Sequence, residues 1–159
     1  MEELRDLNLV PVDSGHQEQL AAFFERIATS PAVTFFQPHE LSANAAQMLA
    51  KYRGKDFYGV VLSGKQILGY GLLRGWDEGY EIPSLGLAID DRFRGYGLGR
   101  LMMEYLHAVA RLRGAQRVRL RVKEDNHQAL KLYRSMAYEL TLESGGYLVG
   151  FLTLVKSKK

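Results

Sequence analysis

Apolar residues recur along the chain with two different periods, and these separate the expected strands from the expected helices. Short runs that are alternating or continuously apolar predict strands. Apolar residues spaced three and four apart predict amphipathic helices. The expected strands span residues 7–10, 57–63, 67–73, 85–89, 117–122, 138–142 and 148–154. The expected helices follow Ser14 and Ser42, open at Leu98, and run from Asn126 to Met136.

The order of these elements is β-α-α-β-β-β-α-β-α-β-β. This order predicts an α+β fold with a mixed, mostly antiparallel sheet of about seven strands and helices on both faces. The strands at 85–89 and 117–122 flank a helix, so we expect them to pair in parallel through a right-handed crossover. One domain is expected over residues 1–155, followed by a basic solvated tail at 156–159.

Composition and charge narrow the classes of function. The chain has 159 residues, of which 47% are hydrophobic and 25% charged, as in an ordinary globular domain. A net charge of +3 is too small to demand a nucleic-acid partner, but it suits a polyanionic cofactor. The chain has no cysteine, which excludes a disulfide framework and a thiolate nucleophile. Its four histidines show no ligand spacing, so we expect no metal.

The N-terminus and the hydropathy pattern bear on location. The first residues, Met-Glu-Glu-Leu-Arg-Asp, are acidic and polar, unlike a signal peptide. No apolar run approaches the roughly 20 residues that a membrane span needs. We therefore expect a cytoplasmic protein without a membrane partner.

A glycine-rich turn joins the expected strand at 85–89 to the expected helix at Leu98. Such a turn exposes several backbone N–H groups, and the helix dipole adds partial positive charge, so the junction suits a phosphate or pyrophosphate. Side chains in place of the glycines would hold the anion away from the amides. A plain helix start with flexible turn glycines is the alternative. The turn consists of Arg94, Gly95, Tyr96, Gly97, Leu98, Gly99 and Arg100.

The pattern Arg94-x-x-Gly97-x-Gly99 is neither a P-loop nor the dinucleotide fingerprint. It resembles the signature of the GNAT superfamily of N-acetyltransferases, whose loop holds the pyrophosphate of acetyl-CoA. Residues 126–133, Asn-His-Gln-Ala-Leu-Lys-Leu-Tyr, resemble the family's Asn-x-x-Ala-x-x-Leu-Tyr segment. The two motifs stand in the family's order, and the resemblance covers residues 57–155. It implies the GNAT fold and transfer of an acetyl group from acetyl-CoA to a primary amine of a small molecule or peptide.

The resemblance also assigns roles to individual residues. The backbone of the strand before the loop would pair with the pantetheine of the cofactor, and an N–H near Ile89 would polarise the thioester carbonyl. Tyr133 would be the general acid that protonates the departing thiolate, or else a core aromatic residue. Asn126 would contact the cofactor, or else only cap its helix. The cofactor-binding set thus comprises Leu87, Ala88, Ile89, the seven residues of the turn, Asn126 and Tyr133.

The general base is less clear from the sequence. Glu81 stands four, six and eight positions before Leu85, Leu87 and Ile89, so it would share their face of the strand, and many GNAT enzymes carry a carboxylate just ahead of this strand. Pro83 makes an unbroken strand through Glu81 doubtful. A solvated Glu81 and a role for Glu78 stay open. Arg121 occupies the position at which ribosomal-protein N-terminal acetyltransferases carry a glutamate, which argues against peptide N-terminal acetylation by that base.

Arginines alternate with apolar residues along the strand at 117–122. Arg117, Arg119 and Arg121 therefore share one face of the strand. The simplest interpretation is a solvated face with packed side-chain stems. The sharper hypothesis is that Arg121 is buried and binds an anionic group of the acceptor, because a buried charge needs a partner.

Two other classes of function compete with the enzyme. The chain could be a CoA-binding regulatory module that turns over little or no substrate. Nucleic-acid binding is disfavoured because the arginines lack interleaved aromatic residues and match no nucleic-acid motif. The acceptor is not identified, although residues 35–39 and 76–81 are expected to shape its pocket. The apolar strand at 148–154 suggests a homodimer formed by sheet extension.

Overall fold

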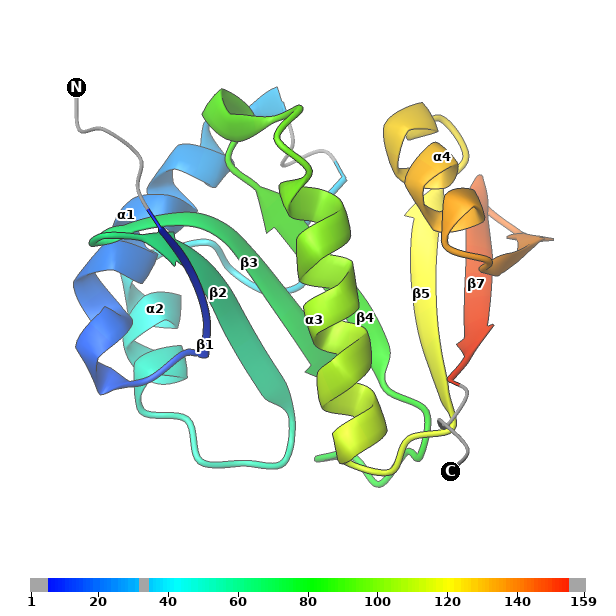
Figure 1. Cartoon of the computed structure of the whole chain (residues 1–159), viewed down its shortest axis with the longest axis horizontal. Helices are drawn as coiled ribbons and strands as arrows, with labels where there is room; N and C mark the ends of the chain where they lie inside the picture. The colour runs from blue at the N-terminus through cyan, green and yellow to red at the C-terminus, as the bar shows by residue number, and fades with distance from the viewer. Residues whose placement is uncertain (1–5, 32–34, 155–159) are drawn as a thin grey trace.

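A seven-stranded mixed sheet forms the centre of the molecule (Figure 1). The computed structural model describes residues 6–31 and 35–154, so the expected tail at 156–159 lies outside the described residues. The strands are β1 (Leu7–Pro11), β2 (Phe57–Ser63), β3 (Gln66–Arg74), β4 (Ser84–Ile89), β5 (Arg117–Lys123), β6 (Glu139–Glu143) and β7 (Tyr147–Thr153). The helices are α1 (Gln17–Ala28), α2 (Ala43–Ala50), α3 (Leu98–Leu112) and α4 (His127–Ser135), with 3₁₀ turns η1 (Ser14–His16) and η3 (Asp91–Phe93). The α+β fold expected from the sequence is confirmed.

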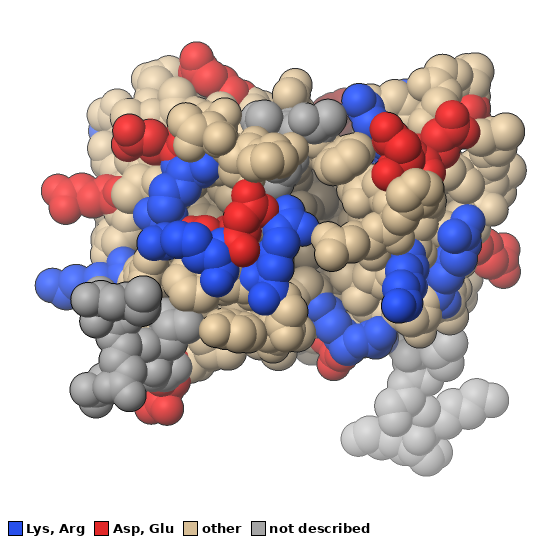
Figure 2. All heavy atoms as spheres, turned by 90° about the horizontal axis from the view of Figure 1, so that it is seen from above, with Lys and Arg blue, Asp and Glu red and all other residues tan. Residues whose placement is uncertain are grey.

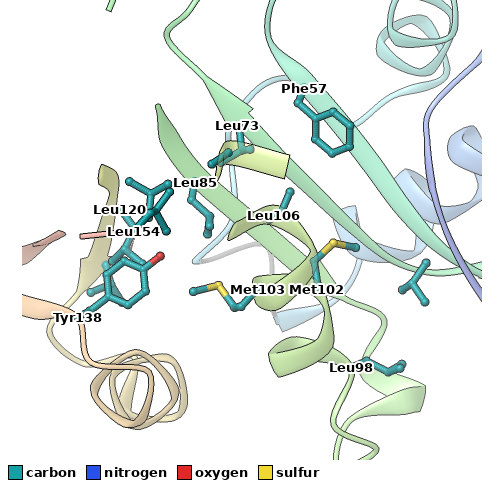
Figure 3. Close-up of a cluster of buried hydrophobic side chains, with 14 of the residues drawn as sticks. Phe57, Leu73, Leu85, Leu98, Met102, Met103, Leu106, Leu120, Tyr138 and Leu154 are labelled. Atoms are coloured by element: carbon teal, nitrogen blue, oxygen red, sulfur yellow. The ribbon is translucent and has the colours of Figure 1, made fainter. Parts of the chain in front are cut away.

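Helices cover both faces of the sheet. The helices α1 and α2 pack on β2 and β3 and enclose one apolar core. The helices α3 and α4 lie on the opposite face (Figure 1), over a second core. Figure 3 shows Met103 of α3 directed toward Tyr138, with Met102 on another side of the helix. A Cβ atom at Gly71 of β3 would lie 2.7 Å from the Met102 sulfur, so this glycine allows the helix to approach the sheet closely.

The helix α3 carries its apolar residues on one stripe. Leu98, Met102, Leu106 and Ala110 are all buried, which is the spacing expected for a helix packed along one side. Gly114 ends the helix in the left-handed region at φ +86°, and its N–H donates to the Arg111 carbonyl at 3.0 Å. None of the helices in residues 6–31 and 35–154 is long and apolar enough to cross a membrane.

The strands β4 and β5 diverge. Their only registered pair is Ser84 with Arg119, and the Arg119 N–H donates to the Pro83 carbonyl at 2.9 Å. Beyond this point β4 stays paired with β3, whereas β5 stays paired with β7. The expected parallel pairing is therefore confined to the start of β4, and the sheet opens beyond it.

Two expectations from the sequence need correction. The strand β7 cannot extend the sheet across a dimer, because it is paired with β5 on one edge and with β6 on the other. The first helix follows Ser14 as expected, but Ser14 is not its capping residue. Asp13 instead caps a 3₁₀ turn, with its carboxylate accepting from the Gly15 N–H at 2.8 Å, and α1 follows from Gln17.

Candidate active site

A cleft of about 800 Å³ lies between the diverging strands β4 and β5. Figure 2 views the molecule from above, toward the end at which β4 and β5 diverge. It shows a hollow with Lys and Arg side chains gathered beside it. The cleft brings together most of the residues that the sequence assigned to cofactor binding. Those that line it are Leu87, Ala88, Ile89, Arg94, Gly95, Gly97, Leu98, Gly99, Arg100, Asn126 and Tyr133.

One wall of the cleft is an unpaired strand edge. Over its whole length β4 pairs with β3, but on its other edge only Ser84 has a registered partner among the described residues. The backbone from Leu87 to Ile89 therefore lines the cleft with main-chain groups that an extended ligand can use. Amide-containing chains bind such edges as an added strand would.

The glycine turn forms an anion cradle at the end of this edge. Gly95 and Gly97 adopt φ values of +85° and +81°, which side chains disfavour. Within the described part of the chain, no acceptor is paired with the backbone N–H groups of residues 95–100, and Leu101 is the first to donate, to the Gly97 carbonyl at 3.1 Å. These free amides stand at the N-terminus of a 15-residue helix, where the dipole favours negative charge.

A buried carboxylate fixes the chain just ahead of the cradle. Asp90 is 3% exposed and accepts hydrogen bonds from Arg26 Nε at 2.8 Å and from Arg92 Nη2 at 2.9 Å. Burial alone would raise the pKa of Asp90, but the hydrogen bonds from Arg92 and Arg26 outweigh it and hold the pKa below its usual range. Asp90 thus ties α1 to the end of β4 and supports the turn that follows.

Arg94 and Arg100 are held at the rim of the cradle. Arg94 donates to Asp91 at 2.6 Å and to the Gln128 side-chain oxygen at 2.9 Å, so it links the turn to α4. Arg100 donates to the Ser135 hydroxyl at 2.6 Å. Both guanidinium groups stand where they can add charge-assisted bonds to an anion in the cradle.

Asn126 fills the role of helix cap and also lies in the cleft. Its side-chain oxygen accepts from the Ala129 N–H at 3.3 Å, at the start of α4. Asn126 is among the residues that line the cleft. The two interpretations drawn from the sequence are therefore compatible, because the cap engages only the amide oxygen.

Tyr133 projects from α4 into the cleft. The residue is partly buried, and burial raises the pKa of its phenol to about 12. Its ring packs against Tyr138 with a centroid separation of 5.7 Å. A phenol with this pKa stays protonated at neutral pH, as a proton donor to a leaving thiolate requires.

Two residues of the predicted set do not line the cleft. Glu81 is exposed and lies on a bend before β4, because the strand begins after Pro83 and does not extend back to Glu81. Its even spacing from the apolar strand residues therefore places it on no common face. Tyr96 is 68% exposed and turns its side chain outward, so only its backbone belongs to the cradle.

The cleft also contains residues that the cofactor assignment missed. Phe35 and Phe36 reach it from the connection between α1 and α2, which the sequence had marked only as part of an acceptor pocket. Gln128 and Lys123 are further lining residues. Lys123 continues the alternation of Arg117, Arg119 and Arg121 along β5, and this periodicity was the signal available in the sequence.

Arg121 lines the cleft but is not a buried, unpaired charge. Its side chain is 49% exposed, and its Nε donates to Glu143 Oε1 at 2.8 Å. The guanidinium also stacks on the Tyr147 ring at 3.9 Å. The reason given for an acceptor contact, a buried charge in need of a partner, is therefore wrong.

Across residues 6–31 and 35–154, no three His, Asp or Glu side chains are grouped so that they could hold a metal ion. Asp91, the carboxylate in the cleft lining, is bonded to Arg94 and Ser30. What the cleft offers is main-chain amides, cations and a phenol.

Comparisons with known proteins agree with this geometry. The chain is similar to the GNAT domain of S. lividans PAT (18% identity, TM-score 0.80, 93% of this chain and 90% of the other). It is also similar to an N-acetyltransferase from Staphylococcus aureus Mu50 (16%, 0.75, 95% and 100%). A third similar structure is yncA, a putative acetyltransferase from Salmonella typhimurium with its cofactor acetyl-CoA (15%, 0.70, 98% and 98%).

The sequence comparisons differ in outcome. A search of curated proteins found no match. The model of the acetyltransferase (GNAT) family matches residues 18–138. This range includes the strands β4 and β5 on either side of the cleft, the glycine turn and Tyr133. The protein therefore belongs to the GNAT family of acetyltransferases.

Proposed function

We propose that the protein transfers the acetyl group of acetyl-CoA to a primary amine of a small molecule or peptide, by direct attack in a ternary complex. The observation that carries the proposal is the continuity of the unpaired β4 edge with the free amides of residues 95–100. The edge suits a pantetheine arm with its two amides, and the cradle suits a diphosphate. CoA joins these two groups in one molecule.

Each part of the cofactor has a partner in the cleft. The diphosphate would accept from the turn amides, with Arg94 and Arg100 turning toward it from their present partners. The pantetheine would pair with the backbone of Leu87, Ala88 and Ile89, and Asn126 would contact it from the opposite wall. The thioester would then lie between Ile89 and Tyr133.

Transfer requires one bond to form and one to break. The amine nitrogen attacks the thioester carbon, and a backbone N–H near Ile89 stabilises the oxyanion of the tetrahedral intermediate. The carbon–sulfur bond then breaks, and Tyr133 donates its proton to the thiolate. Because the chain has no cysteine, no acyl-cysteine intermediate can form.

The proton of the attacking amine has two routes. Glu81 can receive it only through solvent, because it lies outside the cleft lining. Alternatively the proton passes to water without a protein base. In E81Q, a loss of about 100-fold in kcat/KM would support the Glu81 route, and a loss below about threefold would support water alone.

A CoA-binding module with little turnover is the alternative. It is favoured by one observation, that Glu81 is exposed and apart from Tyr133. The two functions share the cofactor and differ in chemistry, so binding and turnover must be measured separately.

Calorimetry with acetyl-CoA tests the cradle, and thiol release over a panel of amino sugars, polyamines, aminoglycosides and peptides tests transfer. The absence of cysteine gives the thiol assay no background from the protein. Binding with acceptor-dependent thiol release supports the enzyme, and binding without release supports the module. No binding at millimolar acetyl-CoA would exclude both.

A further inference from the structure

Within residues 6–31 and 35–154, no helix packs on the face of β5, β7 and β6 that lies opposite α3 and α4; this face is called the open face. The helices α1 and α2 pack instead on β2 and β3. On the open face, Arg117 and Arg121 are exposed and Arg119 is half-buried. Val118, Leu120 and Val122 alternate with them and belong to the core under α3. The arginines therefore face solvent on the side of the sheet away from the glycine turn.

The guanidinium of Arg121 is held in place by two contacts. It stacks on the Tyr147 ring with its central carbon 3.9 Å from the centroid, and its Nε donates to Glu143 at 2.8 Å. These contacts occupy one face of the guanidinium plane and its Nε–H group. The Nη edge has no hydrogen-bond partner within the described residues, and Arg121 lines the cleft. A fixed guanidinium with a free edge is suited to binding carboxylate or phosphate in two-point contact.

The open face has an excess of positive charge. Arg117, Arg119, Arg121 and Lys123 alternate along β5, and the strand registers place Glu139 and Glu143 of β6 on the same face. Four cations thus stand against two carboxylates. Arg119 lies where β4 and β5 part, with Nη1 3.4 Å from the Ser84 hydroxyl. Two of these cations, Arg121 and Lys123, line the cleft, where their positive charge attracts an anion.

The acceptor must reach the cleft from this open face. The glycine turn and Tyr133 lie with α3 and α4, so a bound cofactor approaches the cleft from their side of the sheet. An amine that attacks the thioester then enters from the opposite side. There the walls are Phe35 and Phe36 on one flank, and Arg121 with Lys123 on the other.

We infer that the amine acceptor carries an anionic group, a carboxylate or a phosphate, which the Nη edge of Arg121 binds. The inference rests on the proposed acetyl transfer and adds the class of acceptor to it. Tyr147 and Glu143 act as positioning residues that hold the guanidinium, and Lys123 adds charge beside it.

Matched acceptor pairs test this inference in the turnover assay. One pair is glucosamine 6-phosphate with glucosamine, and the other is 4-aminobutyrate with its amide, so the two pairs separate phosphate from carboxylate. We expect the wild type to prefer the anionic member of one pair by about tenfold or more in kcat/KM. R121A should lower kcat/KM for that member by about 10- to 100-fold, with the neutral member and the KM for acetyl-CoA unchanged.

Arg117 offers a matched control on the same strand. It stacks on Phe151 at 4.3 Å, as Arg121 does on Tyr147, but it does not line the cleft. R117A removes the same charge and the same kind of stacking, so it should behave as wild type toward both members of each pair. Equal preference for neutral and anionic acceptors in the wild type, or equal losses in R117A and R121A, would overturn the inference.

A binding measurement covers acceptors outside these pairs. Inorganic phosphate and acetate are titrated calorimetrically into the wild type, R117A and R121A, each saturated with CoA so that the cradle is filled. We expect one anion to bind R121A about tenfold more weakly than the other two proteins. Identical affinity in all three refutes the Arg121 site. If CoA itself does not bind, the proposed function fails, while the same comparison on the unliganded proteins still decides the role of Arg121.

Discussion

His107 Nε2 and the Tyr138 hydroxyl share a hydrogen bond of 2.7 Å inside the protein core. His107 is 3% exposed and comes from the middle of α3, while Tyr138 follows α4. The Tyr138 ring also packs against Tyr133. This bond therefore connects the helix that begins at the anion cradle with the helix that carries the candidate acid.

Removing the Tyr138 hydroxyl should destabilise the fold. Y138F keeps the ring but leaves His107 Nε2 without its partner in the core. We expect the free energy of unfolding to fall by about 1–3 kcal/mol, measured by urea denaturation. Y147F is the control, because Tyr147 lies on the open sheet face, and it should change stability by less than about 0.5 kcal/mol. Equal effects of the two changes would contradict the structural role of the bond.

The buried histidine should also make stability depend on pH. Burial, together with nearby Arg111, lowers the pKa of His107 to about 4, whereas the unfolded chain has a pKa of about 6.5. Between these values the unfolded state binds more protons, so stability is complete above about pH 6.5 and falls as the pH is lowered. His107 alone should cost about 2 kcal/mol between about pH 7.5 and pH 5.

The comparison with H107Q isolates this contribution. Glutamine retains a polar group for Tyr138 but does not titrate, so H107Q should lose about 2 kcal/mol less than wild type over the same pH interval. The comparison is needed because the pKa of His39 is also lowered by burial. Parallel profiles for H107Q and wild type would refute the assignment.

The sequence predicted the features that depend on local spacing. The apolar stripe of α3 and the glycines before it are short-range patterns, and both lie where the spacing placed them. Asn126 kept two possible roles because a cap and a ligand contact use the same side chain. Glu81 was expected on the face of Leu85, Leu87 and Ile89 because its spacing from them is even. Proline cannot donate to the hydrogen-bond ladder, and the strand begins only after Pro83, so this spacing does not determine where Glu81 lies.

The features that depend on which strands pair, and in which register, could not be predicted from local sequence patterns. Arg121 meets Glu143 and Tyr147 only because β7 inserts between β5 and β6. The expected dimer edge at β7 failed for the same reason. The opening between β4 and β5 likewise follows from the partners that each strand keeps on its other edge, which a single strand's sequence does not reveal.

The substitution Gly99→Ala should raise the stability of the fold and weaken cofactor binding. Gly99 lies inside α3, and an added Cβ would lie 3.5 Å from the Leu132 side chain, an ordinary contact. Helix propensity should then raise the free energy of unfolding by about 0.5–1 kcal/mol. The methyl group would stand in the cleft lining, so we expect CoA affinity to fall about tenfold or more by calorimetry.

Gly97 provides the contrasting variant. Its φ of +81° strains any side chain, although no atom lies within 4 Å of an added Cβ. G97A should therefore lose about 1–2 kcal/mol of stability as well as CoA affinity. A G99A protein that binds CoA as tightly as wild type would show that the turn does not hold the diphosphate.

Replacing Tyr133 with phenylalanine should affect the chemical step and leave cofactor binding intact. Y133F removes the proton donor to the thiolate, so kcat should fall about 100-fold, while the KM for acetyl-CoA changes less than about threefold. Y105F is the control, because Tyr105 packs on Phe57 and does not line the cleft. Since burial raises the pKa of Tyr133 to about 12, its ionisation should cause no loss of kcat below about pH 10. A Y133F enzyme with wild-type kcat would assign Tyr133 to packing alone, and water would then have to protonate the leaving thiolate.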